Sequence, residues 1–194
     1  MNAFEDLIAL LLRRKGYWTS TALKVVLTKE EKREIGTHSA PRWEIDVVAY
    51  KGATNEVLAV ECKSFLDSTG VVFRQGAFEP PDTYKLFSRE KTRTVVMNAM
   101  IRQLQSCGAC GPDPVLRIAL ATGHIARKTD RDQMKAHFDG QGWLLFDDEW
   151  VRNQLSATAE ADYENEAAIV VAKLLLRGGP SSTRASSSDS GISS

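Results

Sequence analysis

Apolar and polar residues alternate along the chain in patterns that predict both helices and strands. An apolar stripe at helical spacing predicts a helix over 2–15, with Asn2 as its N-cap and Glu5 completing a capping box. Short alternating or β-branched stretches predict five strands, at 22–28, 43–50, 57–63, 115–122 and 142–146. Helical patterns predict further helices at 91–106, 130–140, 147–155 and 160–177, whereas 29–42 reads as a loop.

The order of these elements predicts a mixed sheet. The first three strands follow one another through turns or loops, so we expect them to pair antiparallel. The later strands are separated by helices, so we expect them to run parallel to a neighbour, with helices on both faces of the sheet. The segment 64–90 mixes aromatic residues with Gly and Pro and fits neither period.

Composition limits the class of protein. The 194 residues suit a main domain over 1–156, a C-terminal helix over 157–177 that packs on it or forms an interface, and a disordered Ser/Gly-rich tail over 178–194. No apolar run approaches the ~18 residues of a membrane span, and the N-terminus lacks a secretory signal, so we expect a cytoplasmic protein. Three cysteines argue against a disulfide framework. A net charge of zero argues against a uniformly basic nucleic-acid surface, although charge can be local.

Four charged residues interrupt the otherwise apolar strands at 43–50 and 57–63: Glu44, Asp46, Glu61 and Lys63. Glu61 and Lys63 share one face of their strand because side chains alternate with a period of two. Asp46 lies on the preceding strand and becomes their neighbour if the register of the hairpin allows it. Buried charges are normally paired, hydrated or bound to a metal.

This set of residues suits phosphodiester hydrolysis. Two carboxylates, Asp46 and Glu61, are ligands of the kind that Mg²⁺ prefers, and the backbone carbonyl of Cys62 is a natural further ligand. A bound Mg²⁺ polarises a phosphate and lowers the pKa of water. Lys63 is suited to orient or deprotonate the attacking water and to stabilise negative charge on the phosphorane.

The pattern D-x(14)-E-x-K across a hairpin resembles the PD-(D/E)xK nuclease superfamily, most closely Mrr-type restriction endonucleases and Holliday-junction resolvase-like proteins. Asp46, Glu61 and Lys63 match the D, E and K positions, and Ile45 stands where the motif has its proline. Glu5 matches a glutamate that these families carry on their first helix. The resemblance covers roughly residues 2–156. It implies the restriction-endonuclease-like fold, a three-layer α/β/α arrangement around a mixed sheet, and catalysis with Mg²⁺, for which Mn²⁺ can substitute.

Each candidate also has a simpler structural explanation. The charged triad could be a cross-strand salt bridge on a solvated face, and Glu5 could serve only the capping box. In 64–90, Arg74 and Gln75 stand among interleaved aromatic residues; basic and aromatic residues together suit DNA contact, but they also suit a loop held by a small core of its own. On the next helix, Arg102 and Gln105 either face nucleic acid or form a solvated surface.

Other features carry less weight. The "CGAC" segment at 107–110 has zinc-ligand spacing but lacks a second pair of ligands, so a helix-ending turn is the better interpretation.

From the charged triad and the resemblance, we expect a metal-dependent DNA endonuclease that acts on double-stranded or branched DNA in restriction, defence or repair. The alternatives are a catalytically inactive nucleic-acid-binding or protein-interaction module on the same fold, and an RNA-processing nuclease. A homodimer is compatible with cutting two strands, and the apolar helix at 160–177 could form its interface.

Overall fold

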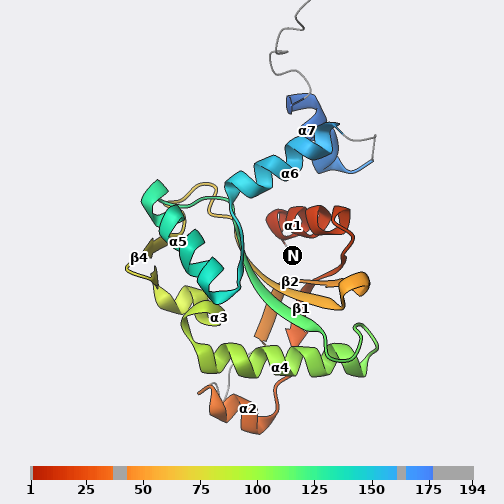
Figure 1. Cartoon of the computed structure of the whole chain (residues 1–194), viewed down its shortest axis with the longest axis vertical. Coiled ribbons are helices and arrows are strands. Elements are labelled where there is room, and N and C mark those ends of the chain that lie inside the picture. Colours follow the sequence, from red (N-terminus) through yellow and green to blue (C-terminus); the bar gives the residue numbers. More distant parts are fainter. Residues whose placement is uncertain (1, 37–42, 161–164, 177–194) are drawn as a thin grey trace, which may run out of the picture. The chain divides into compact units, whose positions relative to one another are not determined.

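A five-stranded mixed sheet forms the centre of the chain in a computed structural model that describes residues 2–36, 43–160 and 165–176 (Figure 1). Its strand order is β1-β2-β3-β6-β7. The first three strands pair antiparallel, and β3, β6 and β7 run parallel, as the sequence predicted. The strands are β1 (Trp18–Val25), β2 (Trp43–Lys51), β3 (Glu56–Lys63), β6 (Val115–Thr122) and β7 (Leu144–Phe146).

Helices cover the sheet, which gives a mixed α/β architecture consistent with three layers. The helix α1 (Ala3–Arg14) contacts β1, β2 and β3, while α4 (Glu90–Ser106) lies along the other side of the sheet (Figure 1). Alternation along the strands explains this division. Val48, Val57 and Ala59 pack in one core cluster with Val96 and Met100 of α4, and the intervening strand residues turn towards α1.

The chain divides into two compact units, Met1–Arg152 and Asn153–Ser194. In the first unit, α5 (Lys128–Gln141) contacts β7. Helix α6 (Asp148–Glu160) begins in the first unit and ends in the second. In the second unit, Ile169 and Ala172 of α7 (Ala167–Leu176) are buried, whereas Leu174 and Leu175 are 78% and 75% exposed. The predicted tail at 178–194 lies outside the described residues.

Three predictions of element bounds were wrong. The last helix, predicted over 160–177, begins at Ala167 in the structure, and the preceding helix runs on to Glu160. The other two have identifiable reasons. The first strand begins at Trp18, four residues before the predicted start, because the whole length of β2 is available as a partner and pairs Trp18 with Tyr50. The predicted loop at 29–42 contains a short helix, α2 (Lys29–Glu34). Thr28 caps it, and Glu31 returns a hydrogen bond to the cap in a complete capping box.

The segment 64–90 folds around a small aromatic core of its own. It contains the hairpin strands β4 (Val72–Arg74) and β5 (Ala77–Glu79), the turn η2 (Pro81–Tyr84) and α3 (Lys85–Ser88). The buried rings are Phe73, Phe78, Tyr84 and Phe87; Phe78 stacks on Tyr84 with centroids 4.3 Å apart. These rings are buried against one another, which supports the alternative of a loop held by its own core.

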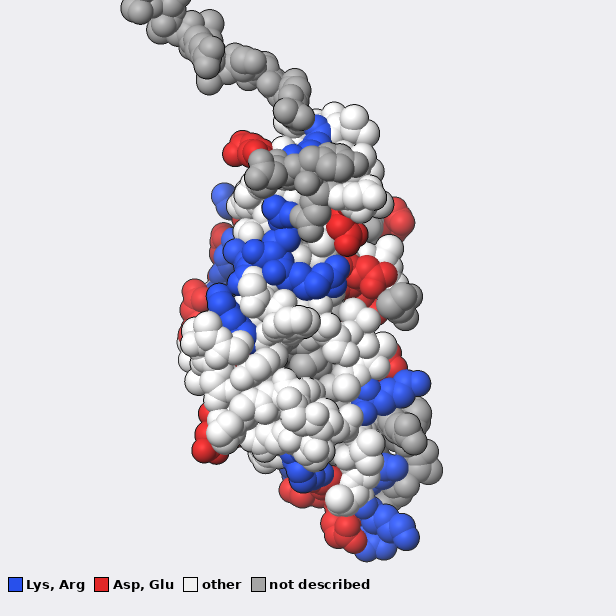
Figure 2. Space-filling view, turned by 90° about the vertical axis from the view of Figure 1, so that its right-hand side faces the viewer, with Lys and Arg blue, Asp and Glu red and all other residues white. Residues whose placement is uncertain are grey.

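Charge is distributed unevenly over the surface despite the balance of the whole chain. Figure 2 shows one face on which basic side chains gather in the upper half with acidic ones beside them, a broad region below them is largely free of charged side chains, and both signs mix at the lower end. Within the described residues, the helices are too short or too polar to cross a bilayer.

Candidate functional site

Asp46 lies where the pairing of β2 with β3 gives way to a side-chain contact. The ladder pairs Lys51 with Glu56 and ends at Val47 opposite Val60, so Asp46 and Glu61 are the next residues of the two strands. There the Asp46 carboxylate accepts a hydrogen bond from the backbone N–H of Cys62 at 2.6 Å. The carboxylate thus takes the place of a backbone acceptor between the two strands. The Asp46 carboxylate therefore lies beside the segment of β3 that carries Glu61 and Lys63, whose charges act on it.

Glu61 and Lys63 form an ion pair on one face of β3. Lys63 Nζ lies 2.7 Å from Glu61 Oε1, and the two side chains are 22% and 17% exposed. Alternation on the strand brings them together, because residues two apart point the same way. A partly buried pair is screened less by solvent than an exposed one, so these charges act strongly on their neighbours.

Burial and neighbouring acids make the position of Asp46 unfavourable for a charged carboxylate. Burial raises the pKa of Asp46, and the hydrogen bond from Cys62 opposes that effect. The negative charges of Glu61 and Glu44 raise the pKa further, while Lys63 lowers it. Like charges that crowd a carboxylate favour either a proton or a cation beside it. The site is therefore prepared electrostatically for a positive partner.

Two carboxylates and a backbone carbonyl suit a hard divalent cation. Mg²⁺ is commonly bound through one or two carboxylates, with water and substrate phosphate completing its shell. Asp46 and Glu61 supply the carboxylates. The carbonyl of Cys62 points to the same side of β3 as its N–H, towards Asp46, because both groups of a strand residue face one neighbour. Within the described part of the chain, His, Cys, Asp and Glu side chains form no cluster of three or more that could hold a metal.

Cys62 and Glu5 lie on the opposite side of β3 from Glu61 and Lys63. The thiol of Cys62 is buried, and that burial, followed by the charges of Asp46, Glu5 and Glu61, raises its pKa. Glu5 is thus within electrostatic reach of Cys62. The Glu5 side chain also accepts a hydrogen bond from the N–H of Asn2 at 3.3 Å in the predicted capping box. The capping box is thus present, and the catalytic role that the resemblance implies for Glu5 stays a prediction.

Tyr84 is a neighbour of the site that the sequence analysis did not single out. It is 2% exposed and stacks on Phe78. Burial, and behind it the negative charge of Glu61, raises the pKa of Tyr84 to about 12. Twenty-one positions separate it from Lys63 in a segment without periodicity, so no local signal connects the two. The aromatic core of 64–90 brings the phenol within electrostatic reach of Glu61.

The loop after β6 supports the end of β3. The N–H of Gly123 donates to the carbonyl of Lys63 at 3.1 Å. A side chain at Gly123 would begin 2.3 Å from the backbone oxygen of Ser64, so the two segments approach more closely than any other residue allows. The hydrogen bond from Gly123 holds the backbone of Lys63 in place.

The four predicted nucleic-acid contacts lie on two separate elements. Arg74 reaches Glu79 across the β4–β5 hairpin at 3.6 Å, and Gln75 is exposed in its turn at a φ of 51°. On α4, Arg102 Nη1 pairs with Glu31 of α2 at 3.0 Å, and Gln105 is exposed. The interactions of Arg74 and Arg102 thus engage neighbouring acids rather than the site residues.

The "CGAC" segment forms the end of α4. Cys107 caps the helix, Gly108 adopts a left-handed φ of 72°, and the N–H of Ala109 donates to Leu104, as in a Schellman turn. Cys107 is exposed and Cys110 is half-buried. His124 is exposed, His137 is half-buried on α5, and His38 lies outside the described residues.

Comparisons of the chain with protein-family models, curated proteins and solved structures found no match. Function must therefore be inferred from the residues themselves.

Proposed function

We propose that this protein is a metal-dependent nuclease with a restriction-endonuclease-like fold, and that Asp46, Glu61 and Lys63 form its active site. The observation that carries the proposal is the hydrogen bond from the Cys62 N–H to Asp46, which holds a carboxylate between two strands and within electrostatic reach of a second acid, Glu61. A purely structural hairpin has no need of this arrangement, because burying crowded carboxylates costs free energy.

Each residue has a distinct role in this proposal. Asp46, Glu61 and the Cys62 carbonyl would hold Mg²⁺, which would supply charge to polarise the phosphate and lower the pKa of water. Lys63, mounted two residues after Glu61, would orient the attacking water and stabilise negative charge that develops on the phosphoryl oxygens. Glu44 and Glu5 would strengthen the negative field that attracts the cation.

The substrate class that we propose is double-stranded or branched DNA. The support is the sequence resemblance to Mrr-type and resolvase-like nucleases, together with a surface on which basic side chains gather locally (Figure 2). Phosphate contacts of this kind give affinity without reading the sequence.

One observation favours a non-catalytic module on the same fold. Lys63 already neutralises Glu61 at 2.7 Å, so a cation must compete with an internal partner. An inactive protein would keep this pair as a structural ion bridge and would use its surface for binding alone.

A cleavage assay separates the two. Supercoiled plasmid, a four-way junction, single-stranded DNA and RNA are incubated with the protein and MgCl₂ or MnCl₂, beside Lys63→Met and the matched control Lys85→Met, an exposed lysine outside the site. We expect cleavage of a DNA substrate that falls by about 10²-fold or more in Lys63→Met and not in Lys85→Met. Cleavage that is equal in both variants, or absent with every substrate and metal, would refute the proposed enzyme.

A further inference from the structure

Two adjoining cavities flank Arg93 at some remove from the carboxylate site. They measure about 380 Å³ and about 310 Å³. Arg93, Gln141 and Trp143 line both, so these three side chains form the wall that the cavities share. Asp46, Glu61 and Lys63 are not among the lining residues.

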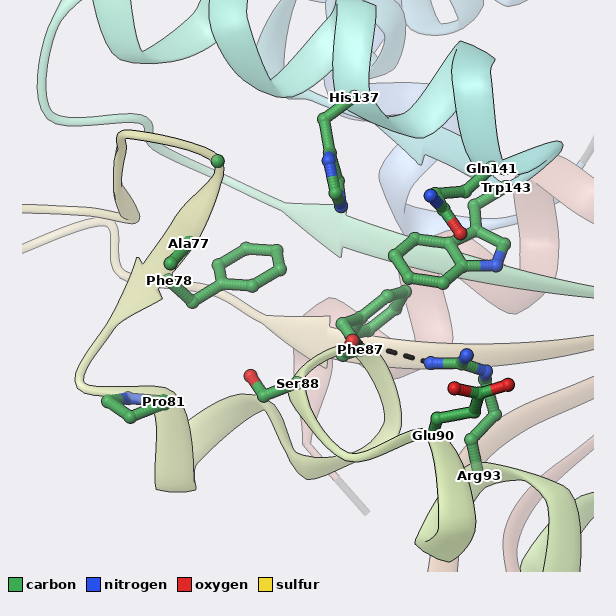
Figure 3. Close-up of a pocket in the computed structure, with 11 residues that line it drawn as sticks. Ala77, Phe78, Pro81, Phe87, Ser88, Glu90, Arg93, His137, Gln141 and Trp143 are labelled. Carbon is green, nitrogen blue, oxygen red and sulfur yellow. Dashed lines mark hydrogen bonds between the residues drawn. The ribbon is translucent and has the colours of Figure 1, made fainter.

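The first cavity is shaped for a flat ring. Phe78, His137 and Trp143 point into it from β5, from α5 and from the strand entry after α5 (Figure 3). The ring of Trp143 is held edge-to-face by Phe87 and Phe138, with centroids 5.4 Å and 5.5 Å away, so this wall is rigid. Aromatic walls favour a planar ligand.

Polar groups that line this cavity can form hydrogen bonds with the edge of such a ring. The side chains of Ser88, Glu90 and Gln141, which carry a hydroxyl, a carboxylate and an amide, line the cavity (Figure 3). A carboxylate accepts hydrogen bonds from N–H groups on a ring edge, and an amide both donates and accepts. A nucleobase carries such donors and acceptors on a flat aromatic ring.

The second cavity is suited to an anion. Arg93 and Arg117 both line it, together with Thr94 and Asn98, and Arg117 Nη1 also lies 3.7 Å from Glu56 Oε1. Arg93 is held in place: Nη1 donates to the carbonyls of Leu86 and Phe87, and the guanidinium lies 4.8 Å from the centre of the Trp143 ring. Arginine presents several donors in a planar fork that matches phosphate oxygens.

We propose that the two cavities together bind one nucleotide, with its base in the first cavity and its phosphate in the second. Arg93, at the shared wall, lies between base and phosphate. The ligand is either a free nucleotide or one nucleotide unit of a single strand, since both offer the same base and phosphate. This binding requires neither a metal nor cleavage, so it stands apart from the proposed nuclease activity.

Calorimetry in EDTA tests the proposal with three probes: GMP, guanosine and a pentadeoxynucleotide. Glu90→Gln removes the carboxylate from the base cavity, and Arg117→Gln removes a cation from the phosphate cavity. Lys85→Gln, which alters an exposed lysine that lines neither cavity, is the control. Thermal unfolding of each variant establishes that it is folded.

The expected pattern is specific to the two halves of the site. Glu90→Gln weakens GMP and guanosine alike by about tenfold, the factor that a charged hydrogen bond is worth. Arg117→Gln weakens GMP by a similar factor and leaves guanosine unchanged. If only the pentadeoxynucleotide binds and responds to both variants, the ligand is a strand unit. No binding of any probe at about 1 mM, or binding that is insensitive to both variants, overturns the proposal.

Discussion

Asp46 combines three features that rarely stabilise a fold at a single residue. It is partly buried, it lies within electrostatic reach of Glu61, and its pKa is raised. Because the folded protein holds this proton to a higher pH than the unfolded chain does, the contribution of Asp46 to stability is greatest below its ordinary pKa of 3.8. That contribution is lost as the pH rises through the folded pKa. At neutral pH the charged residue therefore destabilises the metal-free fold.

Replacing Asp46 by asparagine should reveal this cost. An amide oxygen can still accept the Cys62 N–H, while the negative charge disappears. In EDTA at pH 7, Asp46→Asn should unfold at a higher temperature than the wild type, and the difference should vanish below pH 3.8. Thermal unfolding followed by circular dichroism measures both. Glu30→Gln, at an exposed acid, should show no such gain; a lower midpoint for Asp46→Asn would contradict the role assigned to the charge.

The same substitution should remove the response to metal. Wild-type protein should gain thermal stability on addition of MnCl₂, because a ligand that binds only the folded state stabilises it by mass action. Asp46→Asn should gain little, whereas Glu30→Gln should respond like the wild type. An equal response in all three proteins would place any metal elsewhere.

At the scale of residues, alternation alone identified Asp46, Glu61 and Lys63 as candidates. Their meeting depends on register, and the apolar faces of β2 and β3 fix that register because a slip by one residue would turn every side chain over. Tyr84 could not be found in this way. Its approach to Glu61 depends on rings that meet from distant parts of the sequence, such as Phe78 and Phe138, with centroids 6.1 Å apart.

At the scale of elements, the contact between β3 and the loop after β6 determines where Lys63 lies. Gly123 approaches the backbone of Ser64 too closely for a side chain, whereas Gly140 on α5 has open space around the position of a Cβ atom. These two glycines form a matched pair, because the same substitution should have opposite effects.

Gly123→Ala should lower the free energy of unfolding by about 1–3 kcal/mol, since the methyl group must displace backbone. It should also reduce any cleavage activity, because the displaced segment carries Lys63. Gly140→Ala should raise the free energy of unfolding by up to about 1 kcal/mol through helix propensity alone. Urea denaturation of both variants tests this contrast, and a Gly123→Ala protein as stable and active as the wild type would count against the proposed support of Lys63.

Elements with strong periodicity were predicted correctly, and those held by tertiary contacts were not. Strands β2, β3 and β6 and helix α4 are within a residue of their predicted bounds. Thr28 and Glu31 form a capping box that can be recognised in the sequence. Helix α2 was nevertheless not predicted, because its six residues lack an apolar stripe. The three-residue strands β4 and β5 carry too short a pattern to be recognised.

At the scale of the whole molecule, balanced charge conceals local ion networks that make stability depend on pH. Hydrogen bonds from Lys135 and Arg102 lower the pKa values of Glu149 and Glu31, respectively. Groups of this kind contribute stability above their ordinary pKa of 4.5 that is lost as the pH falls through the lowered value. The pKa of Lys135 is raised, mainly by Glu149, so its contribution is present below 10.5 and is lost as the pH rises through the raised value.

Lys135→Met should therefore destabilise the protein most between the ordinary pKa of Glu149, 4.5, and that of Lys135, 10.5. Its midpoint of thermal unfolding should fall below that of the wild type at pH 7, and the gap should close as the pH falls through the lowered pKa of Glu149, whose carboxylate pairs with Lys135. Lys85→Met, at an exposed lysine, controls for loss of a positive charge. A gap that is constant across the pH range would show that Lys135 acts through packing instead.

The proposed site is tested most directly by the rate of DNA cleavage as a function of MgCl₂ concentration, in wild type, Asp46→Asn, Glu61→Gln and the control Glu30→Gln. If Asp46 and Glu61 bind the catalytic metal, wild type and Glu30→Gln should cleave with a saturable dependence on Mg²⁺. Both site variants should lose about 10²-fold or more in rate at every concentration. Cleavage by Asp46→Asn and Glu61→Gln at the wild-type rate and with the wild-type Mg²⁺ dependence would contradict the assignment of the active site.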